Sequence, residues 1–412
     1  MKIAVIGGGA AGLMAAVAAM ETDPTAEVHV FERNDALGKK VLISGGGRCN
    51  VTTGFTGLRE VLSSYPRGGE FLEVAMRNFP PQAVRDWFES RGVPLKSEPD
   101  RRVFPKSDDG RDVVAVFERL FLDTGVTVHF RAAVTGIEKV GDAFSVQARG
   151  LVGPLAFDRV ILTTGGQAYR ETGSIGDGYD FAAKFGHTIM PLAPSLSAMH
   201  VREPWVAGLA GLSVAKARFT LPGERRQSTA GPFIFTHRGV SGPAAFALSS
   251  LLAHEAVSED EPRLVQIDLL PEEVEAAAVT RLNLACQEAP TRFFENALAS
   301  LVPKALASLV CRELGIEPDL HAGKVGKKVM RLAVGWIKAV PVHVTGRAAG
   351  EEFVTAGGVS LKEIEPDTMQ SIFCPGLFFA GEVLDIDGFT GGFNLQSAWA
   401  TGRLAGQSAA QA

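Results

Sequence analysis

The chain has few cysteines, and no two of them have the spacing of a redox or metal-binding pair. Four occur in 412 residues, namely Cys49, Cys286, Cys311 and Cys374. The absence of any Cys-x-x-Cys spacing argues against a dithiol redox centre and against a cysteine-rich zinc site. The histidines show no metal-ligand spacing either, so we expect no metal. Scattered thiols are typical of a reducing compartment, and we predict a cytoplasmic location.

Long apolar runs and blocks of like charge are also missing. No stretch of about 18 uncharged apolar residues is present, so we predict no membrane span. The apolar run over residues 1–6 leads straight into glycines and has no cleavable tail, which argues against a signal peptide. The net charge is −5 and no basic stripe stands out, so we expect no nucleic-acid partner. Residues 323–328 are basic but lack P-loop spacing, and we interpret them as a solvated stretch beside a helix.

Glycine, by contrast, is abundant, with 46 residues that often cluster after apolar runs. Strand and helix patterns alternate over residues 1–190 and again over residues 343–412. Between them, residues 191–270 contain short β-type runs and residues 271–342 are mostly helical in pattern. We therefore predict an α/β fold in which one domain, built from the first and last segments, is interrupted by a β-rich module and a helical module.

The first glycine cluster has the spacing of a dinucleotide fingerprint. Gly7-x-Gly9-x-x-Gly12 follows an apolar strand and opens an Ala-rich helix. In this motif the first glycine permits a tight turn, the second lets the backbone approach a pyrophosphate, and the third lets helix and strand pack closely. Glu32 ends the next strand, 20 residues after Gly12, where a carboxylate can accept both hydroxyls of a ribose. The fingerprint predicts a dinucleotide but does not choose between FAD and NAD.

A second cluster, residues 44–50, contains three successive glycines followed by Arg48, Cys49 and Asn50. We interpret residues 41–43 as a strand that leads into this loop, which favours a role beside a ligand. Arg48 could then add positive charge to a diphosphate or a substrate carboxylate, and the alternative is a flexible loop with a solvated arginine. Cys49 is interpreted as a small buried thiol, with a reactive or flavin-linked thiol as the alternative.

Two further glycine clusters end apolar strands. Thr164 and Gly165 follow the run over residues 159–163, and Asp177 downstream is interpreted as a helix N-cap. Near the C-terminus, Gly381-Glu382 ends another strand, and a glycine-rich turn then opens a long helix. Such a carboxylate can hold a ribityl chain, and such a helix N-terminus can face the flavin edge where reduction builds negative charge.

The distance between the motifs decides the cofactor. An NAD enzyme rarely needs a second contact at the far end of the chain, whereas FAD spans both halves of a large domain, so we predict FAD. No second Gly-x-Gly-x-x-Gly is present, which argues against a dedicated NAD(P)H domain and leaves NAD(P)H as a diffusible reductant.

Together the motifs resemble those of the bacterial HI0933-like flavoproteins, also called the aminoacetone oxidase family of FAD-binding enzymes. The combination that carries the resemblance is SGGGRCN with GE-x-LD-x-DG-x-TGG-x-N-x-Q, and matching stretches span nearly the full chain. The resemblance implies a three-layer, Rossmann-like FAD domain interrupted by a β-barrel-like module and a helical module. It also implies backbone contact with adenine at Ala133 and Val134. The predicted cofactor-binding residues are Gly7, Gly9, Ala10, Ala11, Gly12, Glu32, Arg33, Lys40, Gly46, Gly47, Arg48, Cys49, Asn50, Ala133, Val134, Thr164, Gly165, Gly381, Glu382, Gly392, Phe393, Asn394 and Leu395.

Two functions remain open at this point. The first is an FAD-dependent oxidoreductase that moves hydride between the flavin and a small organic substrate. The second is an FAD-binding protein with a structural or sensing role, suggested by the lack of a convincing acid/base pair. An RNA-modifying flavoprotein is disfavoured by the net charge. Neither the substrate, the catalytic residue nor the oligomeric state follows from the sequence, and Arg48 and Asp385 are catalytic candidates only through their closeness to the motifs.

Overall fold

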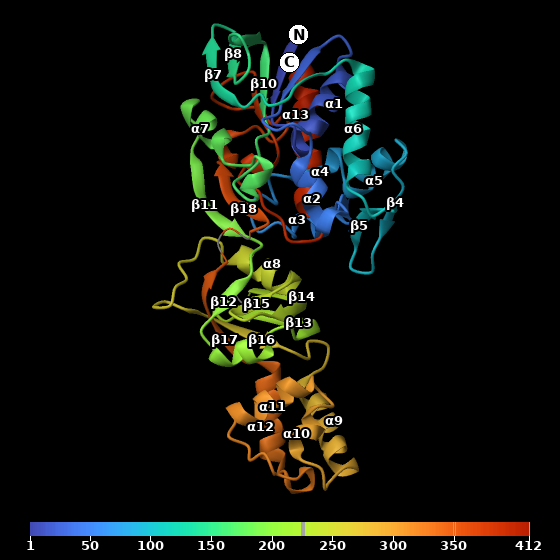
Figure 1. The fold of residues 1–412 in the computed structure, drawn as a ribbon, viewed down its shortest axis with the longest axis vertical. Coiled ribbons are helices and arrows are strands. Elements are labelled where there is room, and N and C mark those ends of the chain that lie inside the picture. The colour runs from blue at the N-terminus through green and yellow to red at the C-terminus, as the bar shows by residue number, and fades with distance from the viewer. Residues whose placement is uncertain (224–226, 349, 351, 412) are drawn as a thin grey trace. The chain divides into compact units, whose positions relative to one another are not determined.

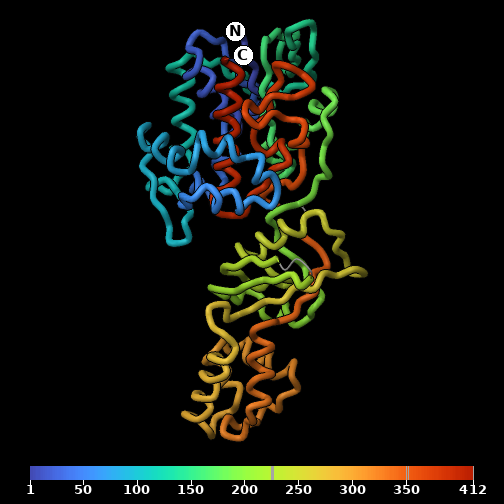
Figure 2. Tube along the Cα trace, turned by 180° about the vertical axis from the view of Figure 1, so that it is seen from behind, coloured from blue at the N-terminus to red at the C-terminus, as the bar shows by residue number. Residues whose placement is uncertain are grey.

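The chain forms two compact units, one inserted into the other. The computed structural model describes residues 1–223, 227–348, 350 and 352–411. Unit 1 comprises Met1–Ser195 and Gly350–Ala412, and unit 2 comprises Leu196–Ala349 (Figures 1 and 2). The chain leaves unit 1 after β11 (Ile189–Ser195) and resumes it at β18 (Val354–Val359), and these strands pair antiparallel. The two connections to unit 2 therefore lie side by side.

A parallel sheet forms the centre of unit 1. Every pair of neighbours in it is parallel, and its strands are short and apolar, as expected for strands covered on both faces. The strand order is β19 (Leu377–Phe379), β10 (Arg159–Leu162), β1 (Lys2–Ile6), β2 (Glu27–Phe31) and β6 (Thr127–His129). The predicted α/β, Rossmann-like class is confirmed.

Helices from the two ends of the chain pack against each other beside this sheet. These are α1 (Ala10–Thr22) and α13 (Phe393–Gln411). A Cβ added at Gly402 of α13 would lie 2.4 Å from the Ala11 carbonyl oxygen, and one at Gly406 would lie 2.1 Å from that of Ala15. Small residues thus let the two backbones touch, and the C-terminal helix is fixed to the start of the chain.

Smaller elements complete unit 1. The meander β7 (Val134–Val140), β8 (Ala143–Ala148) and β9 (Leu155–Phe157) contacts β1 and β10. A second small sheet has the order β3 (Thr52–Thr53), β5 (Arg102–Pro105) and β4 (Leu95–Ser97). The remaining helices are α2 (Lys39–Ile43), α3 (Leu58–Leu62), α4 (Glu73–Asn78), α5 (Pro81–Glu89), α6 (Arg111–Thr124) and α7 (Asp177–Lys184).

Helix α2 corrects one prediction, because residues 41–43 are not a strand. The Leu42 N–H donates to the Gly38 carbonyl oxygen at 2.9 Å, which closes a helical turn, and Val41 is the buried residue of the helix. A three-residue apolar run fits either structure, so periodicity could not separate them.

Unit 2 contains a closed antiparallel barrel. Its order is β12 (Met199–Val201), β15 (Gly239–Ser241), β14 (Gln227–Phe235), β13 (Ser213–Leu221), β16 (Arg263–Asp268) and β17 (Val340–Arg347). Phe233 packs edge-on against Phe219 and Phe235 in the barrel core, and α8 (Pro243–Leu251) contacts β14. The closing strand β17 comes after the helical segment, so residues up to Arg347 take part in the barrel.

The helical segment of unit 2 lies in sequence between β16 and β17. It consists of α9 (Glu275–Glu288), α10 (Phe294–Leu298), α11 (Lys304–Glu313) and α12 (Lys327–Lys338) (Figure 1). Among the residues described, no helix of either unit has the length and apolar character that a bilayer crossing requires. The same residues contain no group of three His, Cys, Asp or Glu side chains that could hold a metal ion.

Candidate dinucleotide site

The turn between β1 and α1 is built so tightly that its glycines are required. Gly7 has a φ of +111°, and a Cβ there would lie 2.6 Å from the Thr163 carbonyl oxygen. A Cβ at Gly12 would lie 1.9 Å from the Gly7 carbonyl oxygen and 2.6 Å from Thr163 Oγ1. The first and third glycines of the fingerprint therefore bring the turn, the helix and β10 into direct contact.

Gly9 differs because it faces open space. A Cβ added there would meet no atom within 4 Å, although Gly9 is the N-cap of α1 and its φ of −81° suits any residue. The first turn of α1 contains no acidic residue, and its leading N–H groups carry the positive end of the helix dipole. This space in front of a helix N-terminus has the chemistry of an anion site and fits a pyrophosphate.

Glu32 lies beside this turn and is buried. Its Oε2 accepts the Gly8 N–H at 2.9 Å, and its Oε1 accepts the N–H and the Nδ2 of Asn34 at 2.8 and 2.7 Å. An ionised carboxylate has about four acceptor positions, so capacity remains for a ribose hydroxyl. The Ala132 N–H donates to the Glu32 carbonyl oxygen at 2.9 Å, which brings Ala133 and Val134 alongside.

The next residue, Arg33, forms an ion pair with Asp177. Asp177 begins α7, but Gly176 is the N-cap and no side-chain cap is present, so the predicted capping role is wrong. Burial raises the pKa of the Asp177 carboxyl group, and the charge of Arg33 opposes that rise. Arg33 therefore links the end of β2 to α7, a contact that local sequence could not reveal.

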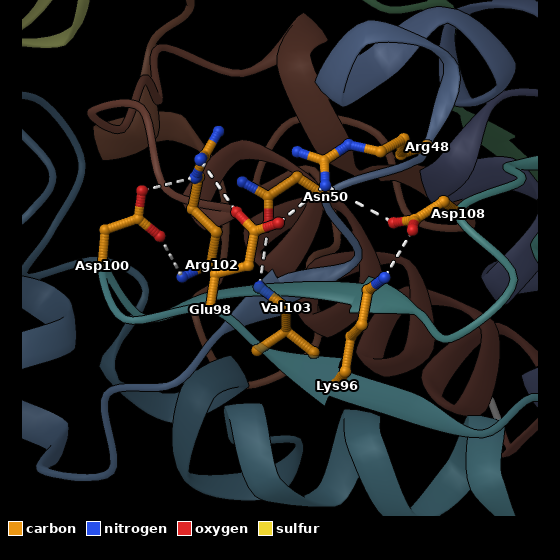
Figure 3. Close-up of polar contacts among 8 residues, drawn as sticks. All are labelled: Arg48, Asn50, Lys96, Glu98, Asp100, Arg102, Val103 and Asp108. Atoms are coloured by element: carbon orange, nitrogen blue, oxygen red, sulfur yellow. Dashed lines mark hydrogen bonds and ion pairs between the residues drawn. The ribbon is translucent and has the colours of Figure 1, made fainter.

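The triple-glycine loop has an open side and a paired side. Gly46 and Gly47 have φ values of +72° and +89°, and a Cβ at either would meet nothing within 4 Å. Arg48, however, points toward the small sheet, where it pairs with Glu98 at 2.6 Å and lies 3.8 Å above the Phe104 ring (Figure 3). Its contact with a phosphate remains a prediction.

Figure 3 shows that the Arg48 pair belongs to a larger network of charges on β4, β5 and the following loop. Asp108 bridges Arg48 and Lys96, and Arg102 pairs with Glu98 at 2.9 Å and with Asp100 at 2.7 Å. Asn50 joins the same sheet, because its Oδ1 accepts the Val103 N–H at 3.2 Å. The loop is thus anchored by side chains while its glycine backbone stays accessible.

Cys49 lies on the anchored side of the loop. It is fully buried with a φ of +60°, and burial raises the pKa of its thiol to about 12. The thiol is therefore protonated near neutral pH, and the nucleophilic thiolate is scarce.

Glu382 is the point at which three of the glycine motifs meet. Its Oε2 lies 2.6 Å from Lys40 Nζ, and its Oε1 accepts the Thr355 N–H at 2.9 Å. A Cβ at Gly166 would lie 2.9 Å from the same Oε1, and a Cβ at Gly381 would lie 2.7 Å from the Ala11 Cβ. The C-terminal motif is thus placed directly against the start of α1 and the end of β10.

The turn before α13 joins the second motif to the fourth. A Cβ at Gly392 would lie 2.2 Å from the Thr52 carbonyl oxygen, and Thr52 Oγ1 donates to Gln396 Oε1 at 2.6 Å. Phe393 is buried, and its carbonyl oxygen accepts the Tyr65 hydroxyl at 2.7 Å. Asn394 bonds both the N–H and the carbonyl oxygen of Gly388 at 2.8 Å, so its side chain holds the turn and leaves backbone groups for a ligand.

Two features near the site had no signal in the sequence. Asp387 is fully buried and accepts two bonds of 2.5 Å from Arg67, and Ser195 Oγ donates to it at 2.7 Å. Thr164 Oγ1 and the Tyr179 hydroxyl are buried without a hydrogen-bond partner among the described residues. Burial, together with the negative charges of Glu382 and Asp385, raises the pKa of Tyr179. The partners of Asp387 come from distant segments, which local sequence patterns do not reveal.

Comparison with known protein families and sequences places the whole chain in one context. The HI0933-like protein Rossmann domain matches residues 1–408. The 3-dehydro-bile acid delta(4,6)-reductase of Clostridium scindens is 31% identical over 413 residues, covering 100% of this chain and 99% of that protein. The ribosomal RNA dihydrouridine synthase of Haemophilus influenzae is 30% identical over 405 residues, covering 96% of this chain and 95% of that protein. The chain is therefore similar to flavin-dependent reductases over its full length.

Solved structures support the fold. The 3-ketosteroid-delta4-(5alpha)-dehydrogenase of Rhodococcus jostii superposes with a TM-score of 0.51 at 17% identity, covering 99% of this chain and 96% of that one. The FrdA chain of E. coli quinol-fumarate reductase gives a TM-score of 0.52 at 16% identity, covering 100% and 70%. At such identities the likeness shows the architecture alone.

Proposed function

The chain belongs to the HI0933-like family of FAD-dependent oxidoreductases, and we propose that it is a reductase of carbon–carbon double bonds conjugated to a carbonyl group. The observation that supports FAD as the cofactor in this proposal is the convergence of Gly9, Glu32 and Glu382 around the start of α1, from segments that are far apart in sequence. An open helix N-terminus, a buried carboxylate and a second carboxylate beside a lysine are the donors and acceptors that FAD needs.

Different residues of this site would bind different parts of the cofactor. The first turn of α1 would hold the pyrophosphate, with Gly9 leaving room for it, and Glu32 would hold the adenosine ribose. Ala133 and Val134 would contact the adenine, and Glu382 would hold the ribityl chain. Lys40 Nζ lies 2.6 Å from Glu382 Oε2, so it can balance the charge of the carboxylate and hold it in orientation.

The proposed bond change comes from the chemistry that two relatives share. A delta(4,6)-reductase of a 3-oxo steroid and a dihydrouridine synthase both saturate a double bond that is conjugated to a carbonyl group. When bound, FAD would supply two-electron chemistry, with hydride drawn from a diffusible donor such as NAD(P)H, delivered to the electron-poor carbon of such a substrate, and a solvent proton added to the neighbouring carbon. Two relatives are named for ribosomal RNA, so the net charge of −5 does not by itself exclude a nucleic-acid substrate.

A half-reaction experiment tests the proposal. The purified holoprotein is mixed anaerobically with NADH or NADPH until its visible flavin absorbance bleaches, and candidate acceptors are then added. We expect reoxidation by a steroid enone or by a uridine-containing RNA, and none by the saturated steroid or by an RNA without pyrimidines. A flavin that only dithionite reduces would favour the binding role, and a flavin that only oxygen reoxidises would point to an oxidase. Either result would overturn the proposal.

A further inference from the structure

Helix α12 in unit 2 presents a second stripe of side chains that is more exposed than its core-facing side, although Trp336 also packs partly against the core. Met330, Ala333, Val334 and Ile337 are buried against the rest of the unit. The opposite stripe repeats at helical spacing and lines a surface hollow of about 590 Å³. The hollow is lined by Lys328, Arg331, Leu332, Gly335 and Trp336 of α12 and by Glu275 and Leu314.

The cations of this stripe lack partners. Residues 321–338 contain five lysines and arginines and no acidic residue. Within the part of the chain that the structure describes, Lys324, Lys327, Lys328 and Arg331 form no ion pair, whereas Lys338 lies 2.7 Å from Asp268. Among the described residues, a row of positive charge without ion-pair partners therefore follows one side of the helix, with the Glu275 carboxylate in the same hollow.

Aromatic rings lie at both ends of this row. Trp336 is half-buried with its ring centroid 6.2 Å from that of Trp205, and a Cβ at the neighbouring Gly335 would meet nothing within 4 Å. At the other end Phe293 is 46% exposed and lies 5.4 Å from the His321 ring. The Phe294 N–H donates to the Leu320 carbonyl oxygen at 2.8 Å, which holds this aromatic pair beside the start of the basic stretch.

We propose that this face of α12 binds a single-stranded nucleic acid. Among the described residues, lysine and arginine side chains without ion-pair partners suit a phosphate backbone, and the partly exposed rings at the two ends of the row suit stacked bases. These are the two elements shared by single-strand binding surfaces. A local patch decides such binding, so the net charge of the whole chain is no obstacle. A lipid surface is a poorer fit, because Leu332 is the single exposed aliphatic side chain on the stripe. The inference rests on unit 2 alone and does not depend on what unit 1 reduces.

Fluorescence anisotropy of a labelled single-stranded oligouridylate, titrated with the full-length holoprotein over a range of salt concentrations, tests this inference. The double variant Lys328→Ala/Arg331→Ala should bind at least about tenfold more weakly. Its slope of log affinity against log salt should fall in magnitude by about 1.4, since each phosphate contact contributes ~0.7 on a single strand. Trp336→Leu should weaken binding by roughly 5- to 150-fold with little change in that slope, because stacking is worth ~1–3 kcal/mol per base.

A matched control removes the same charge from the same module. Lys304→Ala/Arg312→Ala alters two exposed cations of α11 and should leave RNA affinity within about twofold of the wild type. Equal losses in both double variants would indicate general electrostatics and overturn the proposal. So would tighter binding of anionic phospholipid vesicles than of RNA, or no measurable RNA binding at low salt. Flavin absorbance and reduction by NAD(P)H, measured in all variants, should be unchanged, so failure here is distinguishable from failure of the reductase assignment.

Discussion

Replacing Gly9 by alanine tests the cofactor site without disturbing the fold. The backbone at Gly9 suits any residue, and the added methyl would meet no protein atom within 4 Å. The free energy of unfolding of the apoprotein should therefore change by less than about 0.5 kcal/mol. The methyl would instead occupy the space in front of α1 and displace a phosphate from the backbone N–H groups. Loss of one charge-assisted hydrogen bond costs about 1.5–3 kcal/mol, and the Kd for FAD should rise by roughly 10- to 150-fold.

Gly12→Ala is the matched control, because there the methyl has no room. Its Cβ would lie 1.9 Å from the Gly7 carbonyl oxygen, so the backbone must move, at a cost of about 3 kcal/mol or more. Urea unfolding of both apoproteins and titration of each with FAD, followed by flavin fluorescence, separate the two effects. A folded Gly9→Ala protein with wild-type FAD affinity would refute the reasoning, as would a Gly9→Ala protein that is as unstable as Gly12→Ala.

Three other predictions follow from buried polar groups. Glu32→Gln should weaken FAD binding about tenfold or more, because an amide offers one acceptor oxygen in place of two; an unchanged Kd in equilibrium dialysis would contradict this. Asp387→Asn removes the buried negative charge that pairs with the Arg67 guanidinium and should lower the free energy of unfolding by about 3–5 kcal/mol in urea titrations. Burial raises the pKa of Cys49 from 9.0 to about 12, so the folded state holds this proton more tightly than the unfolded state. Its contribution to stability should be constant below pH 9 and decline as the pH rises toward 12, and Cys49→Ser should remove that part of the decline.

The glycine fingerprint could be predicted from sequence because its physics is local. Gly7 and Gly12 are required by contacts within one turn and the strand beside it, and their spacing alone reports this need. The same holds for β1, β10 and β19 of the parallel sheet, which are short continuous apolar runs followed within a few residues by glycine. The architecture followed from where these patterns stop and start again along the chain.

Side-chain partners could not be predicted, because they come from distant segments. Arg33 pairs with Asp177, and Arg48 pairs with Glu98, and nothing in the local pattern marks either carboxylate as the partner. The helix at Lys39–Ile43 was missed for a different reason, since its run of apolar residues is too short to show a period. At the helical module the basic stretch over residues 323–328 is visible in the sequence, but the hollow that α12 lines is not.

The arrangement of α1 against α13 has a consequence for how the protein is made. The two helices are separated by roughly 370 residues, which take roughly 20–75 s to translate at typical speeds. Throughout that time α1 is without the backbone that later covers Ala11 and Ala15, whereas unit 2 has a hydrophobic core of its own and needs nothing from the final segment. Unit 2, which lies in the middle of the sequence, can therefore fold before unit 1 is complete. Until α13 has been synthesised, unit 1 is incomplete and we expect it to need chaperones. A chain that ends before α13 would contain a folded unit 2 and an incomplete unit 1.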